Sequence, residues 1–197
     1  MATLHADATD SAPALLLRPW EPRDLDALIE VYRDPVLRQW TQLHVTDRDD
    51  GARWLEEQWR GWAAGTRLSF AVFEPAEEPA AGLTEGGLPT SRLVANVAIK
   101  RPDPTEPTAE VGYWTAAARG RGVAPRALEA LTAWAFRTLD GSGPDVGLDH
   151  LELLHQVDNT ASCRVAEKSG YDFEAILPAY PPSYPLDGHL HIRRNPR

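Results

Sequence analysis

The segment Arg119-Gly120-Arg121-Gly122-Val123-Ala124 combines residue types that can hold a phosphate group. Glycine lets the backbone turn sharply and approach a ligand closely. The helix expected behind this segment presents unpaired N–H groups and a partial positive charge, which together suit a pyrophosphate. Arginine side chains can bind a phosphate through two hydrogen bonds at once. The segment is therefore either an anion-binding loop or a basic, glycine-containing turn in front of a helix.

Two common phosphate-binding motifs do not fit this segment. A nucleoside-triphosphate loop requires Lys-Ser or Lys-Thr after its last glycine, and neither follows Gly122. The dinucleotide-binding motif requires a further glycine where the sequence has Pro125. Proline is well placed in a first helical turn, because its missing N–H has no partner to lose there. The pattern alone leaves the identity of the phosphate ligand open.

Motifs in three other parts of the chain accompany the loop. Arg119-x-x-Gly122-x-Ala124 resembles the acyl-CoA signature [QR]-x-x-G-x-[GA] of the GNAT superfamily of N-acetyltransferases, and residues 109–114 (AEVGYW) resemble the strand before it. Residues 159–171 are similar to the following motif in the RimJ/RimL-like branch, and residues 17–20 (LRPW) resemble the opening of the family. The resemblance covers about residues 15–194, with the motifs in the family's order.

The resemblance implies a binding site for acetyl-CoA, the co-substrate of such enzymes. In them the loop N–H groups hold the pyrophosphate, and the strand before the loop separates from its neighbour to pair with the pantetheine arm. A pantetheine contact from Asn159 is implied as well, although this residue could equally be a plain helix N-cap. The cofactor-binding residues expected from the resemblance are Tyr113, Trp114, Thr115, Arg119, Gly120, Arg121, Gly122, Val123, Ala124 and Asn159.

Two residues are candidates for the chemistry. An amine with a pKa of about 10 is mostly protonated at neutral pH, so a base must take its proton before it attacks a thioester. The resemblance places this base at Glu110, acting directly or through water; the alternative is a solvated or ion-paired glutamate at a strand start. The resemblance also favours Ser162 as the proton donor to the departing thiolate, and the alternative is a local cap.

The other titratable residues point to no metal. His189 and His191 lie at strand spacing on one face, but two histidines without a third ligand do not make a zinc site. His155 is expected on the polar face or edge of a strand, and Cys163 in ordinary packing. The sequence therefore predicts no metal cofactor.

Short apolar runs and amphipathic stretches predict the elements that would position these residues. Strands are expected at 15–17, 69–73, 93–100, 110–115, 148–154, 173–177 and 189–193, and helices at 25–32, from Thr46 as a cap to Gly65, at 123–139 and at 159–169. This order predicts an α+β fold on a mixed sheet, and the resemblance makes it a GNAT-like, mostly antiparallel central sheet flanked by helices. Residues 1–14 are aperiodic and predict a flexible tail, 15–197 a single acyl-CoA N-acyltransferase domain, and 76–91 a long mobile hairpin loop.

The composition narrows the class of protein. The 197 residues include 20 Lys+Arg and 29 Asp+Glu, and the resulting charge of −9 argues against nucleic-acid binding. The sequence contains no run of about 18 apolar residues, so no membrane-spanning helix is predicted. The N-terminus lacks the basic and apolar regions of a signal peptide, so a cytoplasmic protein is expected. The sequence leaves homodimerisation open.

The sequence thus predicts an N-acetyltransferase that transfers an acetyl group from acetyl-CoA to a primary amine by direct attack. The acceptor is either a protein N-terminal amine or a small-molecule amine. The alternative is a non-catalytic CoA-binding regulatory module. A nucleotide-phosphate-binding protein is a third hypothesis, which the missing lysine motif disfavours.

Overall fold

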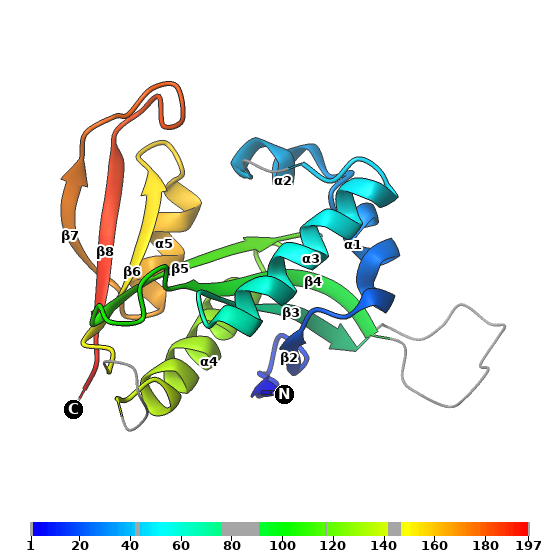
Figure 1. Ribbon diagram of the computed structural model, residues 1–197, viewed down its shortest axis with the longest axis horizontal. Helices are drawn as coiled ribbons and strands as arrows, with labels where there is room; N and C mark the ends of the chain where they lie inside the picture. Colours follow the sequence, from blue (N-terminus) through cyan, green and yellow to red (C-terminus); the bar gives the residue numbers. More distant parts are fainter. Residues whose placement is uncertain (1, 42–43, 76–90, 117, 142–146, 197) are drawn as a thin grey trace, which may run out of the picture.

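In the computed structural model, which describes residues 2–41, 44–75, 91–116, 118–141 and 147–196, an eight-stranded sheet has the order β1-β2-β3-β4-β5-β6-β8-β7 (Figure 1). Its strands are β1 (Leu4–Ala6), β2 (Leu15–Pro19), β3 (Arg67–Pro75), β4 (Ser91–Lys100), β5 (Thr108–Thr115), β6 (His150–Gln156), β7 (Asp172–Leu177) and β8 (Gly188–Arg194). Strands β5 and β6 run parallel, and every other neighbouring pair in this sheet is antiparallel. The expected mixed, mostly antiparallel α+β fold is confirmed.

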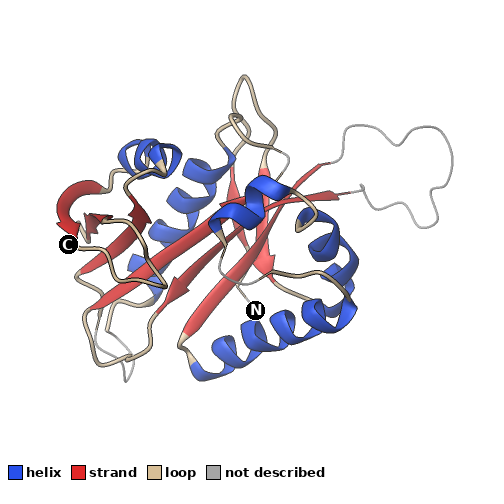
Figure 2. Ribbon diagram, turned by 90° about the horizontal axis from the view of Figure 1, so that it is seen from above, coloured by secondary structure: helices blue, strands red, loops and turns tan. Residues whose placement is uncertain are grey.

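Helices cover both faces of the sheet (Figures 1 and 2). They are a short 3₁₀ turn η1 (Pro22–Asp24), α1 (Leu25–Val31), α2 (Pro35–Trp40), α3 (Arg48–Ala64), α4 (Val123–Thr138) and α5 (Thr160–Lys168). No helix of the described segments is long and apolar enough to cross a bilayer.

Alternation along the strands divides the core into two clusters, because successive side chains of a strand point to opposite faces. On one face Val72, Val97 and Val111 pack with the apolar side of α4. On the other face Phe73 and Trp114 pack with residues of α1 and α3. Each face of β5 therefore belongs to a different layer of the protein.

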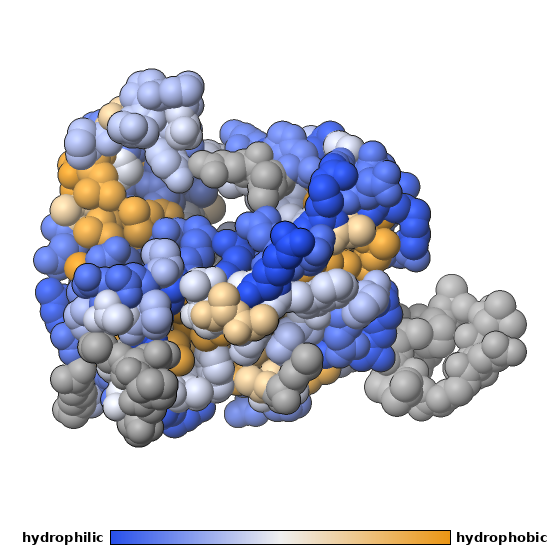
Figure 3. Space-filling model, viewed as in Figure 1, coloured by the Kyte–Doolittle hydropathy of each residue, from blue (hydrophilic) through white to orange (hydrophobic). Residues whose placement is uncertain are grey.

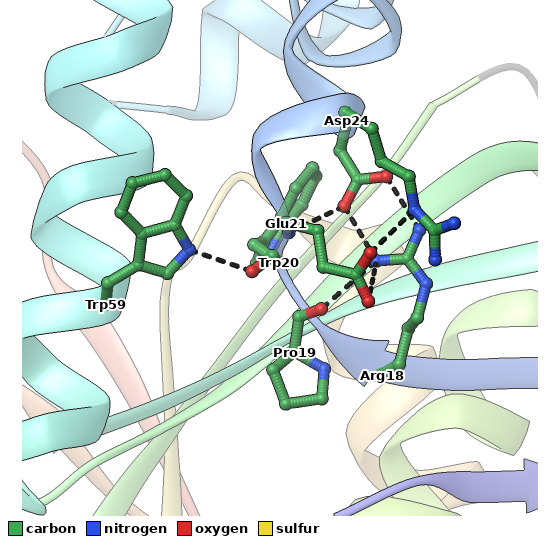
Figure 4. Close-up of polar contacts among 7 residues, drawn as sticks. Arg18, Pro19, Trp20, Glu21, Asp24 and Trp59 are labelled. Carbon is green, nitrogen blue, oxygen red and sulfur yellow. Dashed lines mark hydrogen bonds and ion pairs between the residues drawn. The ribbon is translucent and has the colours of Figure 1, made fainter. Parts of the chain in front are cut away.

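The turn from β2 into α1 is held by a group of polar contacts (Figure 4). The Arg18 guanidinium donates two hydrogen bonds to the Asp24 carboxylate, at 2.8 and 2.7 Å, and lies 3.6 Å from Glu21. The Trp59 indole N–H donates to the Trp20 carbonyl oxygen at 2.8 Å, which joins α3 to the same turn. The Trp20 indole N–H in turn donates to Asn96 Oδ1 at 2.9 Å. The LRPW segment thus anchors the first helices to the centre of the sheet.

The prediction of a flexible tail over residues 1–14 is wrong for Leu4–Ala6, which pair with Leu15–Leu17 as strand β1. The Arg126 guanidinium on α4 also donates hydrogen bonds to the carbonyls of Ala6, Asp7 and Pro13. Since these carbonyls and the buried Leu4 side chain have partners in the fold, this segment is ordered by contacts distant in sequence.

Three local details also differ from expectation. The N-cap of α3 is Asp47, whose carboxylate accepts from the Asp50 N–H at 2.8 Å, and not Thr46. Helix α2 was not expected, because Pro35 suggests a helix end, whereas here it occupies the first turn behind the Asp34 cap. The hairpin loop expected at 76–91 lies, up to residue 90, outside the described residues.

Candidate active site

The parallel strands β5 and β6 separate halfway along β5. Their register pairs Thr108 with His150 and ends at Val111 with Leu153, while β5 continues to Thr115. Strand β4 stays paired with β5 as far as Thr115, so only the β6 side is open. Figure 1 shows the two strands diverging beyond this point. The β6-facing backbone edge of residues 112–115 has no strand partner among the described residues, and a ligand can pair with it.

The loop after β5 has the backbone conformation that the glycine spacing predicts. Gly120 and Gly122 adopt φ values of 78° and 73°, in the left-handed region that glycine enters without a steric penalty. Gly122 is the N-cap of α4 and brings no side chain to the helix end. A Cβ atom at Gly120 would meet no other atom within 4 Å, and one at Gly122 would meet only Arg126 Cδ, at 3.9 Å. The space beside Gly120 and Gly122, in front of α4, can therefore admit an anion, whereas Val123 and Ala124 themselves are buried.

The two loop arginines are held by carboxylates. Arg119 Nη1 donates to Asp34 Oδ2 at 2.6 Å, and Arg121 donates to both oxygens of Glu74 at 3.3 and 3.1 Å. Glu74 is only 2% exposed and also binds Arg92. Partial burial opposes the ionisation of Asp34, but the hydrogen bonds from Arg119 and the Val36 N–H outweigh it and lower the pKa of this carboxyl. In this structure the guanidinium groups thus bind carboxylates, and the loop backbone is the part free to receive a phosphate.

A hydroxyl pair bridges the opening on the α5 side of the sheet. The Tyr113 hydroxyl lies 2.8 Å from Ser162 Oγ, and the Ser162 N–H donates to Asn159 Oδ1 at 3.1 Å. Asn159 is the N-cap of α5, which confirms the capping role considered for it. Burial raises the pKa of Tyr113 to about 12, so its hydroxyl keeps its proton at neutral pH. Sequence reasoning assigned Tyr113 only a backbone role, although strand alternation places its side chain on the face that α5 covers.

Glu110 lies on the other face of β5. Its Oε1 accepts from Lys100 Nζ at 2.5 Å, across the β4–β5 pair. The carboxylate lines an open cavity of about 520 Å³, together with Arg67, Asp103, Glu106 and Glu152. The structure therefore does not bring Glu110 and Ser162 together, because they lie on opposite faces of the sheet.

Trp114 and Thr115 close the strand before the loop. The Trp114 ring lies 6.2 Å from that of Trp20 and 5.8 Å from that of Tyr32, within the cluster beneath α1. Its side chain is core, so only its backbone can face the opening between β5 and β6. Figure 3 shows the surface hollowed between the part built from β6, β7 and β8 and the part built from α1, α2 and α3.

Three of the histidines and the cysteine, which sequence reasoning kept apart, meet beside α5. His155, Cys163, His189 and His191 place one ligand atom each within 4.8 Å of one another. The sequence offered only the pair His189 and His191; His155 on the neighbouring strand β6 supplies a third potential ligand, and Cys163 on α5 a fourth. The repeat of His189 and His191 was the one sequence signal for this cluster.

An opened parallel strand pair followed by a bare, glycine-containing loop and a helix N-terminus is a site for an extended ligand with a pyrophosphate. The family model described as "Acetyltransferase (GNAT) domain" matches residues 14–172. The chain belongs to the GNAT family. It is therefore an acetyltransferase, with acetyl-CoA as the acetyl donor and an amine as the acceptor, and the reading as a non-catalytic CoA-binding module is not favoured.

Solved structures share this GNAT fold over nearly the whole chain. A GNAT-family acetyltransferase from Bacillus anthracis has a TM-score of 0.74 at 18% identity, with 100% of each chain covered. RimL, a ribosomal L7/L12 alpha-N-protein acetyltransferase in complex with coenzyme A, has a TM-score of 0.74 at 18% identity, with 96% of this chain and 97% of that one covered.

An acetyltransferase from Salmonella typhimurium that modifies the N-terminal serine of ribosomal protein L7/L12 has a TM-score of 0.72 at 16% identity, with 96% and 98% covered. The RimJ/RimL-like branch that the sequence resembles is thus represented among the similar structures. At these identities the likeness shows the fold. No curated protein matches the sequence.

Proposed function

We propose that this GNAT enzyme acetylates a primary amine that reaches the opening between β5 and β6 from the face of α1 and α3. One observation supports the proposal: a carboxylate, Glu110, lies on one face of β5 two residues before the opening begins, and a hydroxyl pair, Tyr113 and Ser162, lies at the opening on the other face. A proton can therefore be removed from the nucleophile and supplied to the leaving group from opposite faces of the sheet.

The donor is held along the opening. The backbone of Tyr113, Trp114 and Thr115 pairs with the pantetheine arm, and Asn159 contacts it from the start of α5. The pyrophosphate binds the N–H groups of the loop from Arg119 to Ala124. The open β5 edge and the uncapped start of α4 support this arrangement. The acyl-CoA domain comprises residues 15–197, and strand β1 (Leu4–Ala6) from the preceding segment adds one edge to its sheet.

The reaction is a direct transfer. The amine nitrogen attacks the thioester carbonyl carbon, a C–N bond forms, and the C–S bond breaks with its electron pair on sulfur. Glu110 accepts the proton that the nitrogen loses, directly or through water, and the Ser162 hydroxyl, backed by Tyr113, donates a proton to the thiolate. Glu110 then releases its proton to solvent and Ser162 regains one from solvent, so both groups return to their starting states. Because different groups carry out the two proton transfers, each turnover begins with Glu110 deprotonated and the Ser162 hydroxyl protonated.

The acceptor is either a protein N-terminal α-amine or a small-molecule amine. The Salmonella protein with this fold modifies an N-terminal serine, which supports the first class. We also propose a cytoplasmic enzyme, which is supported by the Salmonella protein of this fold that modifies a ribosomal protein. A charge of −9 supports the absence of nucleic-acid contacts, and the exposed Phe173 and Ile176 on the outer strand β7 support a homodimer.

Thermal melting with acetyl-CoA, coenzyme A and ATP tests the donor site. A ligand at about 100 times its Kd stabilises the native state by about 2.7 kcal/mol, so both CoA species are expected to raise the melting temperature and ATP is not. Thiol release with a panel of N-terminal peptides and small amines then identifies the acceptor. No shift with either CoA species would contradict the donor site, and a shift without thiol release from any amine would contradict the catalytic assignment.

Replacing Tyr113 with phenylalanine is expected to lower kcat by about tenfold, because the Ser162 hydroxyl loses its partner at 2.8 Å. Because burial raises the pKa of Tyr113 to about 12, we expect the wild-type rate to show no loss from Tyr113 ionisation between pH 6 and about pH 10. The matched control is Tyr171→Phe, which removes a 2.6 Å hydroxyl contact with Thr132 in the core. That variant is expected to lose about 1 kcal/mol of stability and to keep its kcat. Equal effects on kcat in the two variants would show that the Tyr113–Ser162 pair is only structural.

A further inference from the structure

Three histidines and one cysteine converge on the sheet face that α5 covers. His155 on β6 lies directly opposite His189 on β8, and His191 follows two residues later on the same face. Cys163 reaches the group from α5, and its Sγ lies 3.8 Å from His191 Nε2. Four potential ligand atoms from three elements thus lie within 4.8 Å of one another.

Two separations within the group are close to those of a tetrahedral zinc site, and all four ligand atoms lie within 4.8 Å of one another. Zn–N bonds of about 2.0–2.1 Å and Zn–S bonds of about 2.3 Å place the ligand atoms of a tetrahedron roughly 3.3–3.6 Å apart. His155 Nε2 lies 3.3 Å from His191 Nε2, and the cysteine sulfur lies 3.8 Å from the same nitrogen. A small movement of Cys163 would complete these edges of the tetrahedron.

The other ring nitrogens of two histidines are already committed. His191 Nδ1 lies 3.2 Å from the Tyr171 carbonyl oxygen, and His155 Nδ1 lies 2.8 Å from the Gln156 carbonyl oxygen. A carbonyl oxygen only accepts, so both Nδ1 atoms are the N–H donors and both Nε2 atoms carry lone pairs. Metal-bound histidines are typically oriented by this kind of hydrogen bond. Two Nε2 lone pairs that face each other at 3.3 Å can be satisfied by a shared proton or by a metal ion bound between them.

His189 adds an unsatisfied polar atom. Its Nδ1 is shielded from solvent and has no hydrogen-bond partner among the described residues, which is costly for a buried polar group. The Phe173 ring lies 5.2 Å from the His189 ring and 5.7 Å from the His191 ring, in edge-on contact with both. Phe173 thus packs against one side of the group, although its own side chain is 53% exposed.

We propose that His155, Cys163, His189 and His191 form a binding site for Zn²⁺. Imidazole and thiolate ligands suit zinc and related transition metals, whereas Mg²⁺ and Ca²⁺ prefer oxygen ligands. His191 is fully buried, while the other three residues are partly exposed and leave the site reachable from solvent. With four protein ligands the site is of the closed, structural kind.

A bound ion would join α5 to β6 and β8 next to the hydroxyl pair. Cys163 directly follows Ser162 in the first turns of α5, so a metal bond to its sulfur restrains the helix turn that presents Ser162 to the opening. The ion is a positioning element, and the transfer reaction itself needs no metal step.

Metal titration of the untagged chain tests the site. After treatment with a chelator, the wild-type chain is expected to take up one Zn²⁺ per molecule, with a higher melting temperature. Co²⁺ is expected to give the intense visible bands of tetrahedral coordination and a thiolate-to-cobalt charge-transfer band. A wild-type chain that takes up no zinc and leaves Co²⁺ octahedral overturns the proposal, and this result requires no variant to fold.

Variants then assign the ligands. Cys163→Ser is expected to abolish the charge-transfer band, and His189→Ala to weaken Zn²⁺ binding by more than about 100-fold, since outer-shell partners alone contribute about 10–100-fold. His150→Ala is the matched control, because His150 lies on β6 outside the group and contacts Glu152. It is expected to bind zinc like the wild type. Unchanged zinc affinity in both ligand variants would place the ion elsewhere and overturn the assignment.

Discussion

Replacing Gly122 with leucine is expected to weaken acetyl-CoA binding by at least tenfold, a loss of about 1.4 kcal/mol or more. A side chain at this position starts in the open space before α4, where the nearest protein atom to a Cβ is 3.9 Å away. It would occupy the approach of the pyrophosphate to the N–H groups of Val123 and Ala124. Calorimetric titration with acetyl-CoA measures the change.

Gly65→Leu separates this effect from backbone strain. Gly65 has a φ of 70°, against 73° for Gly122, and a Cβ there meets no atom within 4 Å. Both variants place leucine in the left-handed region, at a cost of about 1–2 kcal/mol of stability. Because Gly65 ends α3 and lies outside the loop, its variant is expected to bind acetyl-CoA like the wild type. Wild-type affinity in Gly122→Leu would show that the loop does not hold the pyrophosphate.

Replacing Glu110 with glutamine is expected to lower kcat by about 100-fold, because the amide cannot accept the proton of the attacking amine. The affinity for acetyl-CoA is expected to stay unchanged, since the proposed donor site comprises residues 112–115 and the loop and does not include Glu110. Steady-state thiol release, combined with a binding titration, distinguishes loss of the base from loss of the donor site.

Glu152→Gln is the matched control for this variant. Glu152 faces Glu110 across the β5–β6 pair, lines the same cavity and has a similarly exposed side chain, 33% against 38%. Its replacement removes the same charge from the same cavity but leaves the expected base in place. If both variants lose kcat equally, the cavity's charge matters and Glu110 is not the base; if neither loses kcat, the proton leaves by another route.

Most of the fold could be predicted because its signals are local. Gly65 and Gly170 end helices in the left-handed conformation, and short continuous apolar runs mark the central strands β3 and β4. Strand β1 could not be predicted, since three residues show no periodicity and their order depends on β2 and on Arg126, more than 100 residues away. Helix α2 was not predicted because a proline can follow the end of one helix or occupy the first turn of the next, and the sequence does not distinguish the two.

In the candidate site, too, features with a local sequence signal could be predicted, and features that depend on distant contacts could not. The loop was predictable because its glycines and the following helix are consecutive in the sequence. The ion pair between Arg119 and Asp34 joins residues 85 apart, and no sequence pattern indicates it. The metal-binding group depends on the register of β6 against β8 and on the rotation of α5, so only the His189 and His191 repeat was visible beforehand.

The separation of β5 from β6 also affects how the sheet can flex. Four residue pairs join these strands, against six between β5 and β4 and seven between β6 and β8. The β5–β6 junction, in the middle of the sheet, is thus shorter than the pairings on either side of it, and we expect the two parts of the sheet to move relative to each other there. A pantetheine arm bound along the free edge of β5, as we propose, would add hydrogen bonds where the β5–β6 pairing has ended. We therefore expect bound acetyl-CoA to restrict the relative motion of the two parts of the sheet, and dissociation of coenzyme A to restore it.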